Sequence, residues 1–373
     1  VSVDVNLDRI ILSANWMGAC GVKGQDAALY DGVSAASSFC QELGVSIPVG
    51  KDSLSMKTSW KDQAGEDKTV VSPVSLVVSA AAPVYDIRNN LLPMFAESVR
   101  DSSLLLIDLG HGKDRLGGSV YSQVTQRFDS VTPDMEDPKE LKKFLELIRS
   151  LSAKGAILAY HDRSDGGLAA ALCEMMFASH VGVEIVADAL VSKDRTLNQA
   201  LFNEELGAVI QVARGRAAEV ERDFEAAGMG WSLKYLGNLT QDDHLNIYLE
   251  GKCVLSEDRV DLQKAWNEVS WQIARMRDNP ECADSEYELI SDKHNGGLVL
   301  TMGFDPEENL AAPFINTGVR PKVAILREQG VNSQNEMASA FLQAGFDAVD
   351  VHMTDLLEGR AKLADFVGLA ACG

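Results

Sequence analysis

The sequence has 373 residues, enough for about two or three domains, and its composition of 46% hydrophobic and 24% charged residues is typical of a protein with buried cores. The formal net charge of -21 excludes nucleic acid and anionic membrane surfaces as partners, because both bind clustered Lys and Arg. A small phosphorylated ligand stays compatible with this charge, since backbone N–H groups and a metal ion can bind one.

Six cysteines occur without any C-x-x-C pair, which predicts neither a disulfide framework nor a zinc site. We therefore expect reduced thiols and a cytoplasmic location. No apolar run approaches the roughly 20 residues that span a bilayer, and the longest, residues 74–84, predicts a buried strand. The sequence opens on Val with no signal-peptide pattern after it, so we expect it to begin inside a longer protein.

Residues 1–94 predict a strand, a helix and two further strands. The helix covers residues 25–43, where apolar positions recur every three or four residues, and Gly44 ends it. The strands are predicted at residues 9–13, 45–49 and 70–82.

Residues 95–252 alternate between strand-like and helix-like segments, which favours an α/β or α+β fold. Residues 104–109 form an apolar run, interrupted only by Asp108, that predicts a buried strand. Asp137 and Pro138 predict the cap and first position of a helix. The later elements are predicted as strand 156–160, helix 167–178, strand 207–213, helix 216–227 and two more strands up to residue 250.

The last part of the chain predicts an amphipathic helix over residues 261–276, a linker over residues 278–318 and a new α/β unit from Pro321. The unit has strands at residues 322–326, 347–352 and 366–371 and a helix at residues 336–344. So few strands cannot close the core of a doubly wound domain, so we expect this domain to continue beyond Gly373.

Residues 161–167 read His-Asp-Arg-Ser-Asp-Gly-Gly between a predicted strand and a predicted helix. Asp162 offers a hard oxygen ligand for Mg²⁺, and the helix start after it offers free N–H groups to phosphate. The alternative is that Ser164 or Asp165 only caps the helix and that the glycines make a tight turn. On this pattern, His161 is predicted to be structural.

Two further loops are candidates for substrate or phosphate contact. Residues 110–119 follow a buried strand and include Gly117, Gly118 and Ser119, which would allow close backbone approach to a phosphate; a turn-rich loop is the alternative. Residues 48–53 differ from a Walker A loop in glycine spacing and in having Asp52 at the Ser/Thr position. Lys51 and Ser53 remain candidates for substrate contact, with an exposed turn as the alternative.

The last α/β unit contributes residues 326–333, at a strand-to-helix junction where such sheets place ligand-facing loops. Cys372 lacks the G-x-C-x-G setting of a strained nucleophile turn. We predict that Cys372 is not catalytic.

Several stretches together resemble the large, single-chain form of the phosphoribosylformylglycinamidine synthase family. They occur in the family's order over nearly the whole sequence, at residues 12–17, 48–56, 161–168, 201–212, 277–284 and 320–335. The resemblance implies the second of two halves similar to aminoimidazole ribonucleotide synthetase, followed by the start of a class I glutaminase α/β domain. The implied domains are 1–94, the end of an N-terminal-type synthetase domain; 95–252, a C-terminal-type domain; 253–319, a helix and linker; and 320–373, the start of the glutaminase.

The resemblance also implies an activity and some of its residues. The reaction is the ATP- and glutamine-dependent conversion of formylglycinamide ribonucleotide to its amidine in purine biosynthesis, with Mg²⁺ and ATP or ADP bound. Asp162 matches a metal ligand of the family and Ser164 a nucleotide contact, whereas the family's catalytic Cys and His residues are expected outside this sequence. Aminoimidazole ribonucleotide and selenophosphate synthetases are alternatives, but residues 320–373 disfavour them. A nucleotide-trapping, structural role is the alternative for this half.

Overall fold

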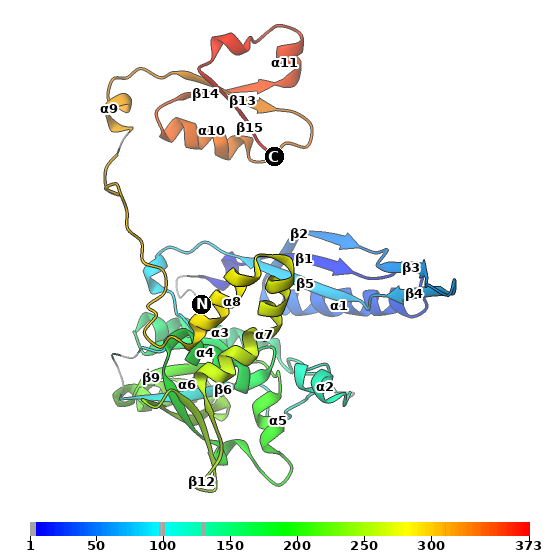
Figure 1. Ribbon diagram of the computed structural model, residues 1–373, viewed down its shortest axis with the longest axis vertical. Coiled ribbons are helices and arrows are strands. Elements are labelled where there is room, and N and C mark those ends of the chain that lie inside the picture. Colours follow the sequence, from blue (N-terminus) through cyan, green and yellow to red (C-terminus); the bar gives the residue numbers. More distant parts are fainter. Residues whose placement is uncertain (1–4, 97, 99–100, 129–130, 310) are drawn as a thin grey trace. The chain divides into compact units, whose positions relative to one another are not determined.

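The computed structural model describes residues 5–96, 98, 101–128, 131–309 and 311–373. The chain forms two compact units, Val1–Asn295 and Gly296–Gly373, and each is considered by itself (Figure 1).

The first unit begins with a small mixed sheet and one long helix. The strand order is β2-β1-β5, with β1 (Ile11–Met17) parallel to β2 (Ser46–Ser53) and antiparallel to β5 (Ser75–Ala81). Helix α1 (Gln25–Leu43) has the predicted bounds and ends at Gly44, whose φ of 79° is left-handed. A separate hairpin pairs β3 (Lys57–Lys61) with β4 (Asp67–Val71). The sequence did not predict β3, and the single strand predicted at residues 70–82 is divided between the end of β4 and β5.

Two predictions for this region are wrong. The apolar run at residues 74–84 contains β5, but Val77 and Val78 are 50% and 47% exposed, so β5 is not a buried strand. An apolar run reports the chemistry of the side chains and not whether another element covers them. The strand predicted at residues 45–49 is longer, because β2 runs on through Lys51 and Ser53, so the alternative of an exposed turn at these two residues is wrong.

A seven-stranded sheet with the order β12-β11-β8-β10-β6-β9-β7 forms the centre of the first unit. Every residue of β6 (Ser102–Asp108) is buried, as predicted. The other strands are β7 (Ile157–Asp162), β8 (Gly182–Val186), β9 (Gly207–Ala213), β10 (Leu233–Thr240), β11 (His244–Leu249) and β12 (Lys252–Asp258).

Helices pack on both faces of this sheet and bury two apolar clusters. One cluster contains Leu168, Leu172 and Met176 of α4 (Gly167–Ser179), and the other contains Phe144 and Ile148 of α3 (Pro138–Ala153). Asp137 caps α3 as predicted, since its side chain accepts a hydrogen bond from the Lys139 N–H. The remaining helices here are α2 (Val120–Thr125), α5 (Leu197–Phe202) and α6 (Ala217–Ala226).

The strand directions bring two loops to one edge of this sheet. Strand β9 is antiparallel to both β6 and β7 and lies between them, so β6 and β7 run parallel to each other. Asp108 pairs with Gly207 and Asp162 pairs with Ala208 in register. The loops that leave β6 and β7 therefore flank the segment that enters β9.

The segment after the sheet is helical for longer than predicted. Helix α7 (Arg259–Arg277) is followed by α8 (Pro280–Glu288), and the two lie side by side (yellow in Figure 1). Trp271 stacks on Tyr287 with ring centroids 4.3 Å apart, and its Nε1 donates to Asp284 Oδ1 at 2.9 Å. The prediction of a linker from residue 278 is wrong over α8.

The second unit is a small parallel sheet, β14-β13-β15, with two packed helices. Its strands are β13 (Lys322–Arg327), β14 (Asp347–His352) and β15 (Gly368–Ala371), and its helices are α9 (Ala312–Ile315), α10 (Gln334–Gln343) and α11 (Met353–Leu357). The mixed α/β class predicted for the chain is confirmed. Among the described residues, no helix combines the length and apolar character that crossing a membrane requires.

Candidate nucleotide site

The loop after β7 presents its side chains alternately outward and inward. Asp162 and Ser164 are exposed, whereas Arg163 between them is 4% exposed. In the described part of the chain, no side-chain hydrogen bond engages Asp162 or Ser164. The two residues predicted to bind metal and nucleotide are therefore accessible at adjacent places in the loop.

Arg163 anchors this loop inside the protein. Its backbone N–H donates to Gly207 O at 2.8 Å, and its Nε donates to Glu205 O at 2.6 Å. Nη2 donates to Asp108 Oδ1 at 2.7 Å and to Leu206 O at 3.1 Å. One side chain thus ties the loop after β7 to the end of β6 and to the segment before β9.

Asp108 is a buried carboxylate with several cationic neighbours. It is 2% exposed, and Lys234 Nζ donates to its Oδ2 at 2.8 Å while Arg195 Nη2 lies 3.7 Å away. Burial by itself raises the pKa of Asp108, but the charges of Arg163 and Lys234 and their hydrogen bonds outweigh it, so the pKa lies far below its usual range. Asp108 is therefore ionised at neutral pH and acts as the centre of a charge cluster.

Asp114 lies in the same cluster, and its pKa is shifted upward, in the direction opposite to that of Asp108. Burial raises its pKa and the nearby negative charge of Asp108 adds to this, although Arg195 acts in the opposite direction. Arg195 Nη2 donates to Asp114 Oδ1 at 2.6 Å, and Asn203 Nδ2 donates to the same oxygen at 3.0 Å. The loop after β6 is thereby bonded to residues on either side of α5, Arg195 before it and Asn203 after it.

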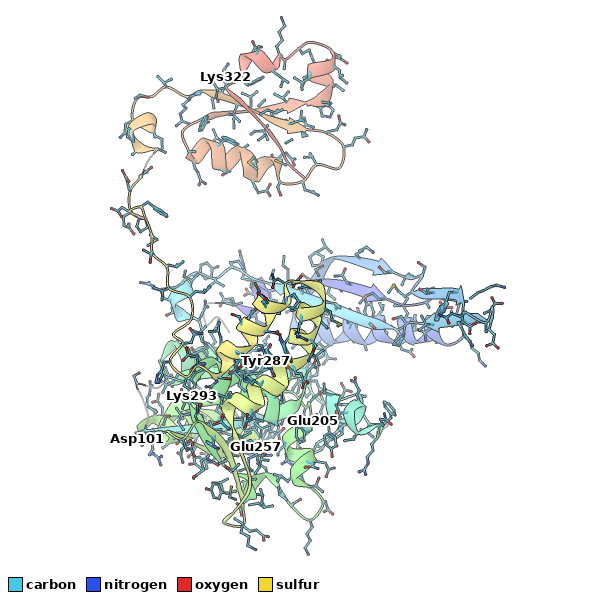
Figure 2. All side chains as sticks on the ribbon, viewed as in Figure 1. Asp101, Glu205, Glu257, Tyr287, Lys293 and Lys322 are labelled. Carbon is cyan, nitrogen blue, oxygen red and sulfur yellow. The ribbon has the colours of Figure 1, made fainter. Side chains whose placement is uncertain are left out.

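Residues 203–207, which lead into β9, contact both candidate loops. Glu205, labelled in Figure 2, is fully buried. It accepts three hydrogen bonds from Arg115: from the backbone N–H at 3.0 Å, from Nε at 2.7 Å and from Nη2 at 2.8 Å. Glu204 Oε1 accepts from Gly166 N and from Val120 N, both at 2.9 Å. This segment therefore joins the start of α4 to the glycine-rich loop.

Gly167 meets two requirements that exclude other residues. Its φ is 69°, and a Cβ built on it would lie 2.6 Å from Asn203 O and 2.8 Å from Leu201 O. The Gly-Gly start of α4 thus permits close packing against the segment before β9. Two N–H groups at this helix start are already used, since Gly166 N bonds to Glu204 and Gly167 N bonds to Ser164 O at 2.9 Å.

The glycine-rich loop is largely held by internal contacts. Gly117 is buried and its N–H donates to Val131 O at 2.7 Å. Ser119 is also buried, and its hydroxyl caps α2 by accepting from Ser122 N at 3.2 Å and donates to Leu116 O at 2.6 Å. Of the three residues predicted here, Gly118 is the exposed one.

Lys51 and Ser53 contact each other on the small sheet. Lys51 Nζ donates to Ser53 Oγ at 2.8 Å and to Asp52 O at 3.3 Å. Both residues belong to β2, whereas Asp162 and Ser164 lie at the end of β7 in the seven-stranded sheet. The contacts of the β7 loop therefore do not include this pair.

A cavity of about 570 Å³ lies beside α3, with Tyr160, Phe144 and Arg149 in its wall together with residues 5–8. Tyr160 and Asp162 are two residues apart on β7, and side chains two apart in a strand point to the same face. The cavity is therefore on the side of the sheet to which Asp162 points. Burial, and then the charge of Asp162, raise the pKa of the Tyr160 hydroxyl far above its usual range.

His161 is bonded on both ring nitrogens. Nε2 lies 2.8 Å from Glu174 Oε2 on α4, and Nδ1 lies 2.7 Å from Asp162 O. These contacts fit the structural role that the sequence predicts for it.

A magnesium ion fits this loop through Asp162. No cluster of three or more His, Cys, Asp or Glu side chains suited to a metal is present in the part of the chain that the structure describes. Mg²⁺, however, commonly takes only one or two carboxylates and completes its shell with phosphate oxygens and water. An exposed, unengaged carboxylate beside an exposed hydroxyl satisfies that need for one protein ligand.

In the second unit, the loop after β13 meets the end of β15. Gln329, Gly330 and Cys372 line a hollow of about 160 Å³, and Asn332 N donates to Gly373 O. Cys372 is half-buried, and its thiol has no hydrogen bond within the described residues. The predicted ligand-facing loop at residues 326–333 and Cys372 are therefore neighbours.

Sequence reasoning missed Asp108, Arg163, Glu204 and Glu205. Arg163 was visible only as one residue of a motif, and the two glutamates only as part of a stretch that resembles a family. The sequence feature that could have indicated them is the presence of charged residues in segments whose apolar pattern predicts burial. An ionised side chain in such a segment needs a partner of opposite charge or a hydrogen bond.

Comparison with known families gives three matches along the chain. Residues 1–83 match the FGAR-AT PurM_N-like domain, residues 102–250 match the C-terminal domain of AIR synthase related proteins, and residues 320–373 match a CobB/CobQ-like glutamine amidotransferase domain. These matches combine an AIR synthase-related domain with a glutamine amidotransferase domain in one chain. Together with the PurM_N-like match, they support a protein of the phosphoribosylformylglycinamidine synthase type.

Solved structures with a similar fold include two groups. PurL of T. maritima complexed with ATP is 12% identical, with 67% of this chain and 36% of that chain covered and a TM-score of 0.45. HypE of E. coli is 16% identical, with 66% and 72% covered and a TM-score of 0.45. A HypE–HypF complex is 18% identical, with 69% and 81% covered and a TM-score of 0.49. The chain thus spans about a third of the length of that PurL.

Proposed function

We propose that this chain takes part in the ATP- and glutamine-dependent conversion of formylglycinamide ribonucleotide to formylglycinamidine ribonucleotide, a ligase reaction of purine biosynthesis. The observation that carries the proposal is the order of three domains in one chain: a PurM_N-like domain, an AIR synthase-related domain and a glutamine amidotransferase domain. Six unpaired cysteines support action in the cytoplasm, where thiols stay reduced. In this reaction ATP transfers a phosphoryl group to the amide oxygen. Ammonia from glutamine then attacks the amide carbon, and the oxygen leaves as phosphate.

The proposed domains are 1–94, the end of an N-terminal-type synthetase domain; 95–252, a C-terminal-type domain; 253–319, a helix and linker; and 320–373, the start of the glutaminase. The ranges of the family matches support the first, second and fourth of these. The boundary at residue 252 falls within β12, which pairs in the seven-stranded sheet, so the folded C-terminal-type domain extends to Asp258. In residues 253–319, α7 and α8 pack on each other, so this region is folded over these two helices.

Within this arrangement, Asp162 and Ser164 form the protein side of a Mg²⁺–nucleotide site. Asp162 supplies one hard oxygen ligand, and the Ser164 hydroxyl is placed to donate to a phosphate oxygen. When bound, the metal would neutralise phosphate charge. Support comes from the exposure of both side chains, from the lack of a side-chain hydrogen bond to either one from the residues that the structure describes, and from the inward Arg163 that fixes the loop between them. The cavity beside Tyr160 offers space on the same side of the sheet.

The site in this half is proposed to hold its nucleotide structurally rather than to turn it over. Support comes from the charge cluster beneath the loop, because Asp108, Glu205 and Arg163 are all buried and bonded to other parts of the protein. Because these side chains are buried and hydrogen-bonded to other parts of the protein, they stabilise the fold and are not free to act as a catalytic acid or base. A structural nucleotide should survive dialysis and remain unhydrolysed.

The test uses the complete enzyme. Asp162→Ala is expected to lower the amount of nucleotide that stays with the protein through dialysis, measured by chromatography of the released nucleotide. It should also lower the thermal midpoint, since a ligand that binds only the folded state stabilises it. Asp188→Ala, an exposed carboxylate after β8, is the control. Unchanged nucleotide content and an unchanged midpoint in Asp162→Ala would refute the site.

A further inference from the structure

The segment before β9 holds the two candidate loops together through adjacent glutamates that point to different partners. Glu204 Oε1 accepts hydrogen bonds from Gly166 N at the start of α4 and from Val120 N at the start of α2. Glu205 is fully buried and bonded three times to Arg115 in the glycine-rich loop. Two adjacent residues, Glu204 and Glu205, thus connect the loop after β7 with the loop after β6.

Both loops are also close-packed against this segment, so their positions depend on it. A Cβ on Gly110 would lie 2.6 Å from the Glu205 side chain, and one on Gly167 would lie 2.6 Å from Asn203 O. The Arg163 side chain completes the link by donating to Glu205 O and Leu206 O. Neither loop can shift without moving residues 203–206.

We propose that Glu204 and Glu205 are positioning residues of the nucleotide site, which fix the loop that carries Asp162 and Ser164 and the glycine-rich loop as one rigid wall. This inference rests on the nucleotide site proposed above. Glu204 acts as a hydrogen-bond acceptor for two backbone N–H groups, and Glu205 acts as the buried counter-charge of Arg115. Neither glutamate needs to touch the nucleotide, because each acts through the loops that it bonds.

Glu204 gives the sharper test, since its role depends on acceptance and not on charge. Gln keeps a carbonyl oxygen of similar reach, whereas Ala removes the acceptor. On the complete enzyme stripped of nucleotide, Glu204→Ala should weaken the binding of Mg-ADP about tenfold, which corresponds to about 1.4 kcal/mol. Glu204→Gln should restore affinity to near that of the unaltered protein. Binding is measured by calorimetry and the thermal midpoint of the stripped protein is recorded beside it.

Glu219→Ala is the matched control. Glu219 is a partly buried carboxylate whose two oxygens accept from Arg216, both at 2.9 Å, beyond the other end of β9. Its loss should leave the affinity for Mg-ADP unchanged. A general loss of stability would weaken binding in this control as well and would not be repaired by Gln at position 204.

The outcomes separate the two proposals. If Asp162→Ala weakens binding and Glu204→Ala does not, the positioning role is overturned and the nucleotide site stands. If Glu204→Gln is as weak as Glu204→Ala, the role as an acceptor is overturned. If Asp162→Ala also leaves binding intact, the site itself is refuted and this inference with it. Should Glu204→Ala not fold, Glu204→Asp replaces it, because the shorter side chain cannot bridge both N–H groups.

Discussion

Arg163 and Asp108 form a buried ion pair, with Nη2 and Oδ1 2.7 Å apart, that joins the loop after β7 to the end of β6 across β9. The two side chains are 0% and 2% exposed. Charges buried to this degree are stable only when each has a partner, and removing one partner leaves the other uncompensated.

Arg163→Met should therefore lower the free energy of opening around β9 by about 3 kcal/mol. The readout is amide hydrogen exchange along β9, which reports the stability of this sheet without contributions from other domains. The matched control is Arg214→Met, which breaks the exposed pair between Arg214 and Asp101. A surface pair contributes at most about 1 kcal/mol, and equal losses in the two variants would contradict the assignment.

The same cluster predicts a pH dependence with a definite sign. The folded-state pKa of Asp108 lies below its unfolded value, so its contribution to stability is fully present above about pH 4 and is lost as the pH falls toward the folded pKa. The stability difference between the unaltered protein and Asp108→Asn should therefore shrink below about pH 4. A difference that stays constant between pH 6 and pH 3 would show that Asp108 is not held by its cationic neighbours.

Asp114 should show the opposite slope. Its pKa is raised by burial, so ionising it costs stability as the pH rises above its unfolded value. Relative to Asp114→Asn, the unaltered protein should lose stability as the pH rises above about 4. Opposite slopes for two carboxylates of one cluster cannot arise from a general effect of pH on the fold, and parallel slopes would contradict both assignments.

Gly167→Ala tests the close packing at the start of α4. The added Cβ meets Asn203 O and Leu201 O in a left-handed backbone conformation, so we expect a loss of about 3 kcal/mol from strain and contact together. Gly228→Ala separates the two causes, because Gly228 has a φ of 71° but nothing within 4 Å of its added Cβ. Its loss should be about 1 kcal/mol. Similar urea midpoints for the two variants would mean that the contact with residues 201–203 does not matter.

Cys372→Ser should leave glutamine hydrolysis by the complete enzyme close to normal. A nucleophilic thiol of this kind is expected in the G-x-C-x-G setting of a strained turn, and the residues before Cys372 (Leu369, Ala370 and Ala371) do not provide it. The check is the covalent glutamyl adduct detected by mass spectrometry, together with ammonia release. Loss of the adduct in this variant would assign the nucleophile to Cys372.

Local sequence signals predicted the elements that local chemistry decides. The apolar run at residues 104–109, interrupted only by Asp108, predicted β6. Gly44 predicted the end of α1, and Asp137 predicted the start of α3. Helix α8 was missed because its nine residues are acidic and aperiodic, and it is stabilised by the stacking of Tyr287 on Trp271 from another helix.

For the site, the strand-to-helix junction predicted Asp162 as a candidate metal ligand, and the family resemblance added Ser164 as a nucleotide contact; the structure exposes both side chains. The support beneath them was not predictable, since Asp108 and Arg163 are 55 residues apart. Their contact follows from the place of β9 between β6 and β7, and nothing in the local sequence around either residue specifies that order.

The central position of β9 also constrains how the protein can fold. Strands β6 and β7 come earlier in the chain, and the edge that carries both loops exists only after β9 has inserted between them. Contacts of such long sequence separation form slowly, because chain closure costs entropy before the contacts reward it. A partly folded chain therefore has no assembled site. A nucleotide that binds there would stabilise only molecules in which the sheet is complete.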